Sequence, residues 1–515
     1  MTSHVLAVDL GSTGIKVAVV DETGVVRAVA GEVIPLLFVG ERGVEQDPRE
    51  WWSALGRCAR RSVGESGLHG DDITLVAVTS QYTSTTAVDA HGRPLGNTIM
   101  WMDGRGGQYR HGPLTSTDIE RWIDWHGLVP SGNDDIGHVS VIREQWPDVY
   151  AAAAAFVEPM DVLAARLTGV VTATQNSMFP MMAVDNRQWG ATTYSDELLT
   201  MSGLAPDKLP RLVPLGAPRG TVTSEAAAHL GVSRAAVVTG ATIDSVTSAV
   251  GTGAITADSC GLIIGTTSVM ATHLPTKRHD LAHGLTAAPS PLPDSYFLVA
   301  ENGIGGKALD VFVNNMVFPD DGLGSAVHDG SYTAVLEAAG KVPCGSNGIL
   351  FLPWLVGSMA PGHDRRMRGG FVNIGLSSTR TDMARAVLEG VSMNVAWLLP
   401  HFSALAGHPY HEITFGGGGA TSPLWGQILA DATGVAVRRL AHPTCTNAHG
   451  AALLALYETG MCTLDDLPGF LITEEVHEPD ARHHRLLAGR TESLIDFHER
   501  NGSFFGALDS KEHTT

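Results

Sequence analysis

Glycine-rich turns that directly follow short apolar runs are the feature that most restricts how this chain can fold. The first, Gly11-Ser12-Thr13-Gly14, stands between the apolar runs 5–10 and 15–20. A second turn cluster at 21–24 leads into a third apolar run that begins at Val25. Two turns between three apolar runs predict an antiparallel meander.

The segments after the meander predict alternating helices and strands. Asp47 as the N-cap and Pro48 at the first position predict a helix whose buried side includes Trp51. The almost wholly apolar run 73–80 predicts a central strand. We expect the region 147–230, which includes an alanine-rich run, to be mostly helical. Strands and helices in this order indicate an α/β architecture.

The composition of the first turn is repeated about half a chain later. A predicted strand at 237–243 leads into Asp244, and the turn Gly265-Thr266-Thr267-Ser268 stands between two further apolar runs. This echo suggests two similar α/β domains that are joined near residues 251–253.

A third glycine cluster, 416–419, follows the predicted strand 412–415 and precedes the predicted helix 422–433. A strand, a glycine-rich turn and a helix N-terminus let main chain approach a phosphate or a nucleotide closely. No Walker motif follows. Each turn alone could equally be a tight turn that packs a sheet, but three such turns, two with hydroxyl side chains, favour a nucleotide site.

Two aspartates stand where chemistry could occur. Asp9 ends a predicted buried strand, where a carboxylate is costly unless it binds a metal, water or main-chain donors. Mg²⁺ on a nucleotide phosphate would satisfy it, and so would capping of the turn amides. Asp244 follows small residues and could accept a proton from a substrate hydroxyl, or it could cap the helix that begins at Ser245. The local pattern leaves both choices open.

Polar and aromatic residues gather at two predicted strand ends. Gln81, Tyr82 and Thr83 follow the strand 73–80, and Trp101 and Asp103 end the next apolar run. Aromatic faces that stack on C–H groups, beside amide and carboxylate groups that bind hydroxyls, suit a polyhydroxylated ligand. Ordinary packing at exposed strand ends is the alternative.

Composition excludes several other classes of protein. Lys and Arg number 34 against 54 Asp and Glu, a formal net charge of −20, and no basic block suggests nucleic-acid binding. No apolar run approaches the roughly 20 residues that a bilayer requires, and the N-terminus does not resemble a signal peptide. The five scattered cysteines form no CxxC pair, which fits a cytoplasmic protein without a disulfide or cysteine–zinc framework.

Taken together, these residues resemble the FGGY carbohydrate kinases, which belong to the superfamily of sugar kinases, heat-shock proteins and actin, with the xylulokinases nearest. The stretches that carry the resemblance follow the family's order: Leu6 to Lys16, Glu45-Gln46-Asp47-Pro48 with Trp51-Trp52, Trp101-Met102-Asp103-Gly104-Arg105, Gly265-Thr266-Thr267-Ser268, and Gly417-Gly418-Gly419-Ala420-Thr421-Ser422.

The resemblance implies an α/β fold of two actin-like (ribonuclease H-like) domains with an interdomain catalytic cleft. It places an N-terminal FGGY domain at 1–250, a C-terminal FGGY domain at 251–490 and a tail at 491–515. The implied activity is ATP-dependent transfer of the γ-phosphoryl group to a sugar or polyol hydroxyl. Whether the protein forms a homodimer, as is common in the family, stays open.

The resemblance also implies roles for individual residues. Asp244 would be the general base, and Asp9 would help to hold Mg²⁺. The residues implied to bind ATP are Ser12, Thr13, Lys16, Gly265, Thr266, Thr267, Gly306, Gly418, Gly419 and Ser422. The residues implied to bind the acceptor are Gln81, Tyr82, Thr83, Trp101, Asp103, Asp244 and Ser245.

The acceptor pocket departs from the family pattern. Xylulokinases usually read Gln-Met-His where this chain has Gln81-Tyr82-Thr83, and Asn where it has Ser245. Glycerol kinases carry Arg-Glu at 82 and 83. A xylulose-like pentulose and a smaller polyol, such as a tetritol or glycerol, therefore both stay open. An actin-like ATPase without a sugar substrate is the rival from another class, and the pocket residues argue against it.

Overall fold

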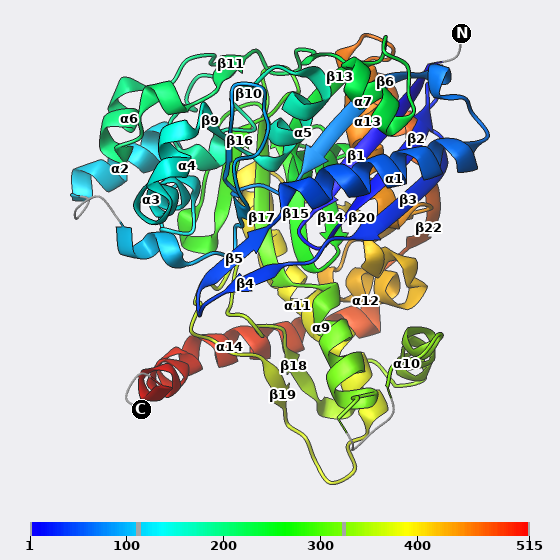
Figure 1. Cartoon of the computed structure of the whole chain (residues 1–515). Helices are drawn as coiled ribbons and strands as arrows, with labels where there is room; N and C mark the ends of the chain where they lie inside the picture. Colours follow the sequence, from blue (N-terminus) through cyan, green and yellow to red (C-terminus); the bar gives the residue numbers. More distant parts are fainter. Residues whose placement is uncertain (1–2, 110–114, 322–325, 513–515) are drawn as a thin grey trace.

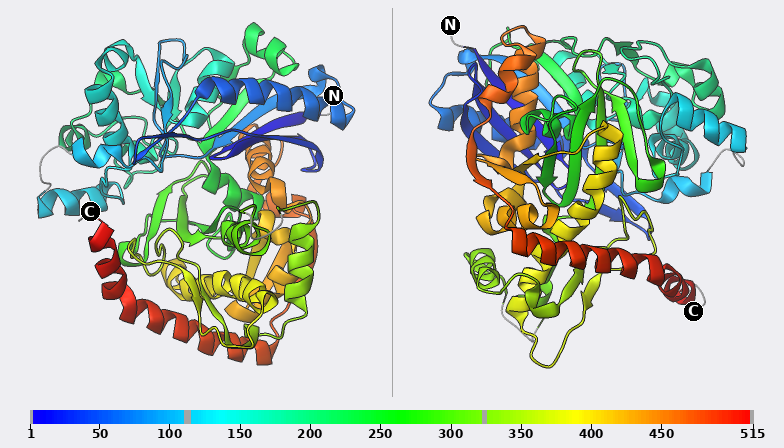
Figure 2. Two further views of the ribbon diagram at one scale, coloured as in Figure 1. Left: turned by 60° about the horizontal axis from the view of Figure 1, so that its bottom comes forward. Right: turned by 180° about the vertical axis from the view of Figure 1, so that it is seen from behind.

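The computed structural model describes residues 3–109, 115–321 and 326–512, with side chains to 508. Two sheet-based parts lie one above the other in the left view of Figure 2, and in Figure 1 the second sheet lies behind the first. In that view of Figure 2 the upper part is built on a six-stranded sheet and the lower part on a seven-stranded sheet. The chain is thus an α/β protein with two sheet-based domains, as expected.

The first sheet contains the predicted meander. β1 pairs antiparallel with β2, and β2 with β3, which confirms that prediction. β6 lies between β1 and β13 and is parallel to both, so its apolar sequence belongs to a central strand, as predicted. In spatial order the sheet consists of β12 (Gly220–Thr221), β13 (Val237–Ile243), β6 (Ile73–Ser80), β1 (His4–Gly11), β2 (Gly14–Asp21) and β3 (Val26–Val33).

Helices cover both faces of this sheet. α1 (Pro48–Ser66) begins after Asp47, whose side chain accepts from the Arg49 amide, and it buries Trp51 against β2 and β3. This confirms the predicted cap and helix start. The opposite face is covered by α8 (Asp244–Gly251) and α13 (Thr446–Glu458), although α13 comes from the second half of the chain.

The region 147–230 is not mostly helical, so that prediction was wrong. The alanine-rich run ends α4 at Ala152 and enters β9, where Phe156 pairs with Ala87 of β7 and is fully buried. Burial of this ring in the core overrides the helix propensity of the alanines before it. The elements between the meander and β13 are β4 (Leu37–Val39), β5 (Gly43–Gln46), β7 (Thr86–Val88), β8 (Thr98–Ile99), α2 (Ser116–Trp125), α3 (Asp135–Gln145), α4 (Pro147–Ala152), β9 (Ala155–Val157), α5 (Pro159–Thr168), β10 (Thr172–Thr174), α6 (Asp196–Ser202), β11 (Arg211–Val213) and α7 (Ser224–Leu230).

The second sheet contains the other two predicted glycine turns. β14 and β15 form a hairpin around Gly265 and Thr266, and β20 runs parallel to β14 before the third glycine cluster. In spatial order the sheet consists of β16 (Leu285–Pro289), β17 (Tyr296–Ile304), β15 (Thr267–Leu274), β14 (Gly261–Ile264), β20 (Glu412–Gly416), β21 (Ala436–Leu440) and β22 (Thr473–His477).

The remaining elements complete the lower part of the molecule. They are α9 (Gly306–Phe312), α10 (Ser331–Gly340), β18 (Leu350–Leu352), β19 (Gly370–Val372), α11 (Arg380–Ala406), α12 (Pro423–Thr433) and α14 (Ala481–Glu512). Residue 491, where we expected a tail to begin, lies inside the continuous helix α14, which runs along the lower edge in Figure 2. Leu487 and Leu494 are both fully buried, so the packing of this helix shows no break at the expected boundary.

The crossing of α8 and α13 joins the two parts of the chain. A Cβ on Gly450 would stand 1.9 Å from the Thr247 carbonyl oxygen, and one on Gly251 would stand 2.2 Å from that of Thr446. The backbones are therefore in direct contact at these two glycines. Around the crossing lies a cluster of buried apolar residues from both halves of the chain, including Val5, Leu75 and Leu453.

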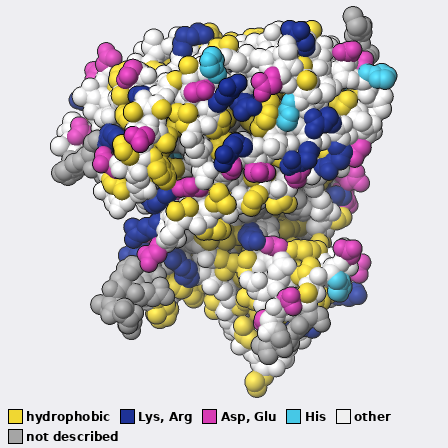
Figure 3. Space-filling model, in the orientation of Figure 1, with side chains coloured by type: hydrophobic (Ala, Val, Ile, Leu, Met, Phe, Trp, Pro, Cys, Tyr) yellow, Lys and Arg dark blue, Asp and Glu magenta, His cyan; other side chains and the backbone are white. Residues whose placement is uncertain are grey.

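The outer surface carries charges of both signs. Lys and Arg side chains are interspersed with Asp and Glu over the face that is drawn in Figure 3, and the surface is hollowed between the upper and lower parts. None of the helices in the described ranges is both long enough and apolar enough to cross a lipid bilayer.

We predict that Gly450→Ala lowers the free energy of unfolding by at least about 1–3 kcal/mol, because the added methyl group must displace the Thr247 carbonyl. The matched control is Gly489→Ala in α14, where an added Cβ would meet nothing within 4 Å and should be neutral or stabilising by up to about 1 kcal/mol. Thermal or urea denaturation measures both. Equal stability of the two variants would show that the crossing tolerates the extra carbon.

Candidate active site

Asp9 and Asp244 lie at the same edge of the first sheet. Asp9 stands opposite Thr79 near the end of β1, and Asp244 directly follows β13, whose last residue stands opposite Ser80. Because β6 separates the two strands, their axes are roughly 10 Å apart. The side chains of Asp9 and Asp244 are close enough for the charge of one to affect the other.

Burial and mutual repulsion shift both carboxyl groups. Burial raises the pKa of Asp9 to about 6, and nearby Lys16 and Asn447 partly offset this rise. Burial, followed by the negative charge of Asp9, raises the pKa of Asp244 to about 7. The Ser245 hydroxyl donates to Asp244 Oδ1 over 3.2 Å and partly offsets the shift. A carboxyl group with a pKa near neutrality is suited to accept a proton from a substrate.

Asp9 has an oxygen free to bind a cation. Oδ1 is buried, and no hydrogen-bond partner among the described residues reaches it. An unpaired buried carboxylate oxygen is costly, and Mg²⁺ binds such oxygens while keeping several waters. The residues present therefore fit a magnesium ion at Asp9.

The structure brings the second and third glycine turns together at the end of β14, beside the turn at Gly305 and Gly306. The Gly306 amide donates to the Gly265 carbonyl over 2.7 Å, and a Cβ on Gly417 would stand 2.6 Å from the Ile264 carbonyl oxygen. Gly265 and Gly418, by contrast, face open space, where a Cβ would meet nothing within 4 Å. Main chain is thus exposed where a nucleotide could approach it closely.

The remaining residues implied to bind ATP differ in their surroundings. Thr13 and Thr266 are exposed, whereas Gly419 and Ser422 are buried. The Ser422 hydroxyl caps α12 by accepting from the Trp425 amide over 3.3 Å. We interpret Ser422 as a residue that fixes the helix start beside the third glycine turn.

The first glycine turn is held in place by neighbouring side chains. Trp101 Nε1 donates to Ser12 Oγ over 2.9 Å, and Gln46 Nε2 donates to the Ser12 carbonyl over 2.8 Å. Lys16 Nζ donates to the Thr444 carbonyl over 2.6 Å and so links this turn region to the second half of the chain. Trp101 thus positions the turn as well as lying near the expected acceptor pocket.

Tyr82, which we expected to bind the acceptor, lies near Asp244 and Ser245. Burial raises the pKa of its phenol, and the negative charges of Asp244 and then Glu301 raise it further, while the Ser245 hydroxyl beside it acts in the opposite direction. Thr83 next to it has φ of 58°, an uncommon conformation for a β-branched residue. Backbone strain of this kind is often found at functional sites.

Asp103, which we expected to contact the substrate, makes its contacts within the protein. It is fully buried, and Oδ2 accepts from the Val44 amide over 2.8 Å. Oδ1 accepts from the Arg105 amide over 2.9 Å, and the Arg105 side chain joins Asp103 to Glu45. We therefore interpret Asp103 as a residue that holds the segment after β8, and its expected contact with the acceptor stays a prediction.

Three residues of the site were missed by sequence reasoning. Gln46 is fully buried, and its amide oxygen accepts from Trp51 Nε1 and from Gln81 Nε2. Glu301 of β17 brings a carboxylate from the second sheet towards Asp244, and Asn447 of α13 lies beside Asp9. Gln46 belongs to the segment Glu45-Gln46-Asp47-Pro48, which carries part of the family resemblance, so the sequence could have indicated its role. The positions of Glu301 and Asn447 depend on how the two halves of the chain meet.

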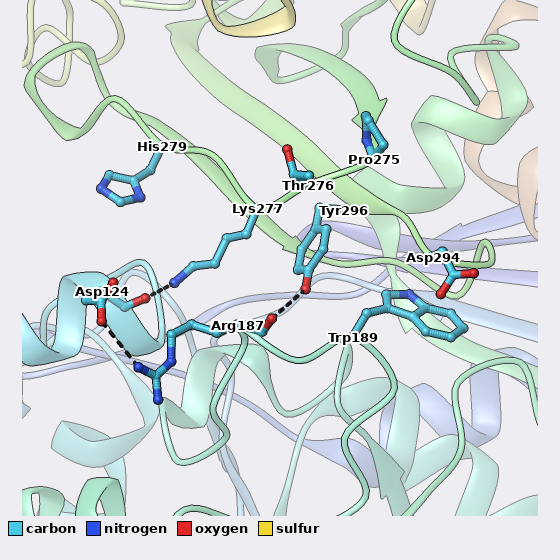
Figure 4. Close-up of a pocket in the computed structure, with 9 residues that line it drawn as sticks. All are labelled: Asp124, Arg187, Trp189, Pro275, Thr276, Lys277, His279, Asp294 and Tyr296. Carbon is cyan, nitrogen blue, oxygen red and sulfur yellow. Dashed lines mark hydrogen bonds and ion pairs between the residues drawn. The ribbon is translucent and has the colours of Figure 1, made fainter.

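The cavity in Figure 4 lies elsewhere between the two parts of the chain. Its volume is about 520 Å³, and it reaches Tyr296 at the first residue of β17, roughly 17 Å along the strand from Glu301. Lys277 donates to the Asp124 carbonyl across it, and burial lowers the pKa of this amine to about 8. The cavity is lined by Asp124, Arg187, Trp189, Pro275, Thr276, Lys277, His279, Asp294 and Tyr296.

Comparison with known proteins agrees with this architecture. A xylulose kinase from Staphylococcus epidermidis is 27% identical over 489 residues, which are 94% of each protein. A gluconokinase from Bacillus subtilis is 25% identical over 508 residues, 95% of this chain and 94% of that protein. The crystal structure of a gluconate kinase from Lactobacillus acidophilus has the same fold, with a TM-score of 0.85 at 20% identity over 99% of this chain and 100% of that one.

The two sheet-based domains thus have the actin-like fold of that kinase, and two interacting carboxyl groups lie where β1 and β13 end. The model of the FGGY family of carbohydrate kinases matches residues 4–251 with its N-terminal domain and 260–459 with its C-terminal domain. The chain belongs to this family and is an ATP-dependent kinase of a small-molecule carbohydrate.

We predict that kcat/KM falls as pH decreases through about 7, because Asp244 must be ionised to accept a proton and its pKa is raised to that value. Since Asp9 and Asp244 interact, the midpoint on the acid side of the pH profile is a property of the two carboxyl groups together. Steady-state rates at constant ionic strength between about pH 5 and 9 measure it. A flat profile across this range would contradict the assignment.

Two variants test the direction of the shift. Glu301→Gln removes a negative charge that raises the pKa of Asp244, so the acid limb should move to lower pH. Ser245→Ala removes a hydrogen bond that lowers this pKa, so the limb should move to higher pH. Shifts in the opposite directions would exclude Asp244 as the titrating group.

Proposed function

We propose that the protein transfers the γ-phosphoryl group of ATP to a hydroxyl of an uncharged pentulose, such as xylulose, or of a polyol of similar size. The observation that carries the proposal is the Asp244 carboxyl, with a pKa near 7, next to the hydroxyl groups of Ser245 and Tyr82. An acceptor hydroxyl that replaces water here would lie beside a base able to remove its proton at neutral pH.

In the proposed mechanism Asp244 accepts the proton of the acceptor hydroxyl while the hydroxyl oxygen forms a bond to the γ-phosphorus. The bond to the bridging oxygen breaks, and ADP leaves with the electron pair. Main-chain amides near Gly265 and Gly418 would bind the phosphates and the nucleoside, since these glycines face open space. Mg²⁺ held by Asp9 would neutralise phosphate charge.

The charges around the pocket favour an uncharged acceptor. Tyr82 lies within the electrostatic influence of Asp244, Glu301 and Glu158, and Asp9 lies beside Asp244. Among the described residues, the positive charge of Lys16 lowers the pKa of Asp9 and that of Arg365 lowers the pKa of Glu301. A sugar acid would bring another negative charge into a site with an excess of carboxyl groups. Gluconate, the substrate in the name of one relative, is therefore disfavoured.

The size of the acceptor is less constrained. Tyr82 adds bulk where xylulokinases usually have Met, and Thr83 and Ser245 stand where they usually have His and Asn, with shorter hydroxyl side chains. These changes remove hydrogen-bond partners for a ketose and supply hydroxyls instead, so a tetritol or glycerol is the alternative acceptor. The cytoplasmic location stays a prediction from the cysteine pattern and the N-terminal sequence, and whether the protein forms a homodimer stays open.

We predict that Asp244→Asn keeps the binding of ATP and of the acceptor but lowers kcat by at least about a hundredfold, because the amide cannot accept the proton. Steady-state kinetics and calorimetric titrations measure the two effects. Asp148→Asn, at an exposed position in the first turn of α4, is the matched control and should keep wild-type turnover. Near-normal turnover of Asp244→Asn would remove this residue from the role of base.

We predict that ADP release requires an added acceptor and that kcat/KM is larger for uncharged pentuloses, pentitols or tetritols than for gluconate. A screen of these compounds and glycerol tests this, with Asp244→Asn as the background. A larger kcat/KM for gluconate would contradict the charge argument. ADP release without an acceptor, together with polymerisation, would favour an actin-like ATPase.

A further inference from the structure

A cluster of metal-ligating side chains lies outside the catalytic centre, on the lower part of the molecule. Asp280 and His283 belong to the segment 275–284 between β15 and β16, and His401 lies near the end of α11. Each of the three offers a nitrogen or oxygen atom, and these atoms all lie within 4.8 Å of one another. The linear sequence gives no sign of this group, because His401 is more than a hundred residues from the other two.

The protein holds this segment in place against α11. The backbones of Asp280 and Leu285 exchange two hydrogen bonds of 2.9 Å, which close the base of the loop. Arg278 Nη1 donates to the Leu405 carbonyl over 2.9 Å and fixes the loop to the last turn of α11. The three side chains are therefore brought together by hydrogen bonds of the backbone and of Arg278 that do not depend on a metal.

The side chains already interact with one another. His283 Nδ1 lies 2.7 Å from Asp280 Oδ2, and the imidazole rings of His283 and His401 are 3.8 Å apart between centroids, with 29° between their planes. Ligand atoms about 2.1 Å from one tetrahedral ion lie roughly 3.4 Å apart. Side-chain rotations that lengthen the His283–Asp280 contact by roughly 0.7 Å and shorten the other separations by at most about 1.4 Å would therefore complete a coordination sphere.

The donor set selects the class of metal. Two imidazoles and one carboxylate suit Zn²⁺ and related transition-metal ions, whereas Mg²⁺ prefers oxygen ligands, as at Asp9. The side chains of His283 and Asp280 are 38% and 31% exposed, so an ion can enter from solvent. Three protein ligands leave the fourth tetrahedral position for water.

We infer that Asp280, His283 and His401 form a binding site for one Zn²⁺ ion, which joins the segment 275–284 to α11. The same segment carries Lys277, which donates to main-chain carbonyls of α2 across the cavity in Figure 4. Zinc at this site stabilises the segment that links the lower part of the molecule to the upper part.

Calorimetric titration of the metal-free, full-length protein with Zn²⁺ in Mg²⁺-free buffer tests the site without any assay of activity. We expect one high-affinity equivalent, and a midpoint of thermal unfolding that rises with zinc concentration. In His401→Ala the affinity for Zn²⁺ should fall by at least roughly 10–100-fold. This is the loss caused by mutating residues that only hold a metal ligand in place. The controls His279→Ala and His363→Ala change exposed histidines near the site and should bind as the wild type does.

Co²⁺ in place of Zn²⁺ identifies the ligands. Visible absorption of tetrahedral Co²⁺ should appear in the wild type and disappear in both His283→Ala and His401→Ala. Absence of the single equivalent, equal affinity in His401→Ala, or an intense thiolate-to-cobalt band that places the ion on a cysteine would each overturn the proposal. Circular dichroism confirms folding, and Asp280→Asn replaces any histidine variant that does not fold.

Discussion

The direct backbone contact between α8 and α13 holds the two halves of this protein together. The Thr247 carbonyl oxygen lies 1.9 Å from where a Cβ of Gly450 would stand, so the helices approach as closely as their main chains allow. α8 begins at Asp244, and α13 carries Asn447 in its first turn, beside Asp9. One helix crossing thus fixes the base of the proposed site and joins residues that are far apart in the sequence.

The two aspartates at this edge of the sheet are costly to ionise in the folded state. Burial raises the pKa of both, and the negative charge of Asp9 raises the pKa of Asp244 further. A raised pKa means that the folded protein binds protons more tightly than the unfolded chain, so the contribution of these two groups to stability is lost as pH rises from 3.8, the ordinary pKa of Asp, to about 6 for Asp9 and about 7 for Asp244. Such pairs are typical of sites that bind cations or move protons.

Much of the fold could be predicted because its signals are local. Asp47 and Pro48 start α1 through the conformations that they favour, and the apolar run of β6 identifies a strand that is covered on both faces. The prediction failed at Phe156, where alanine-rich sequence favours a helix but burial of the ring against β7 requires a strand. The sequence also gave no sign that α14 continues through residue 491, because this helix is held by packing on the lower part of the molecule.

The sequence by itself determined the glycine turns, the strands before them and the aspartates at the strand ends, because these depend on residues adjacent in the chain. Only the tertiary structure decided which carboxylate is free to act. Asp103 accepts a hydrogen bond from the amide of Val44, 59 residues away, whereas Oδ1 of Asp9 is buried and has no hydrogen-bond partner in the described part of the chain. Glu301 likewise reaches Asp244 only because the two sheets meet. Hydrogen bonds and charges act through space, so their partners are known only once the chain has folded.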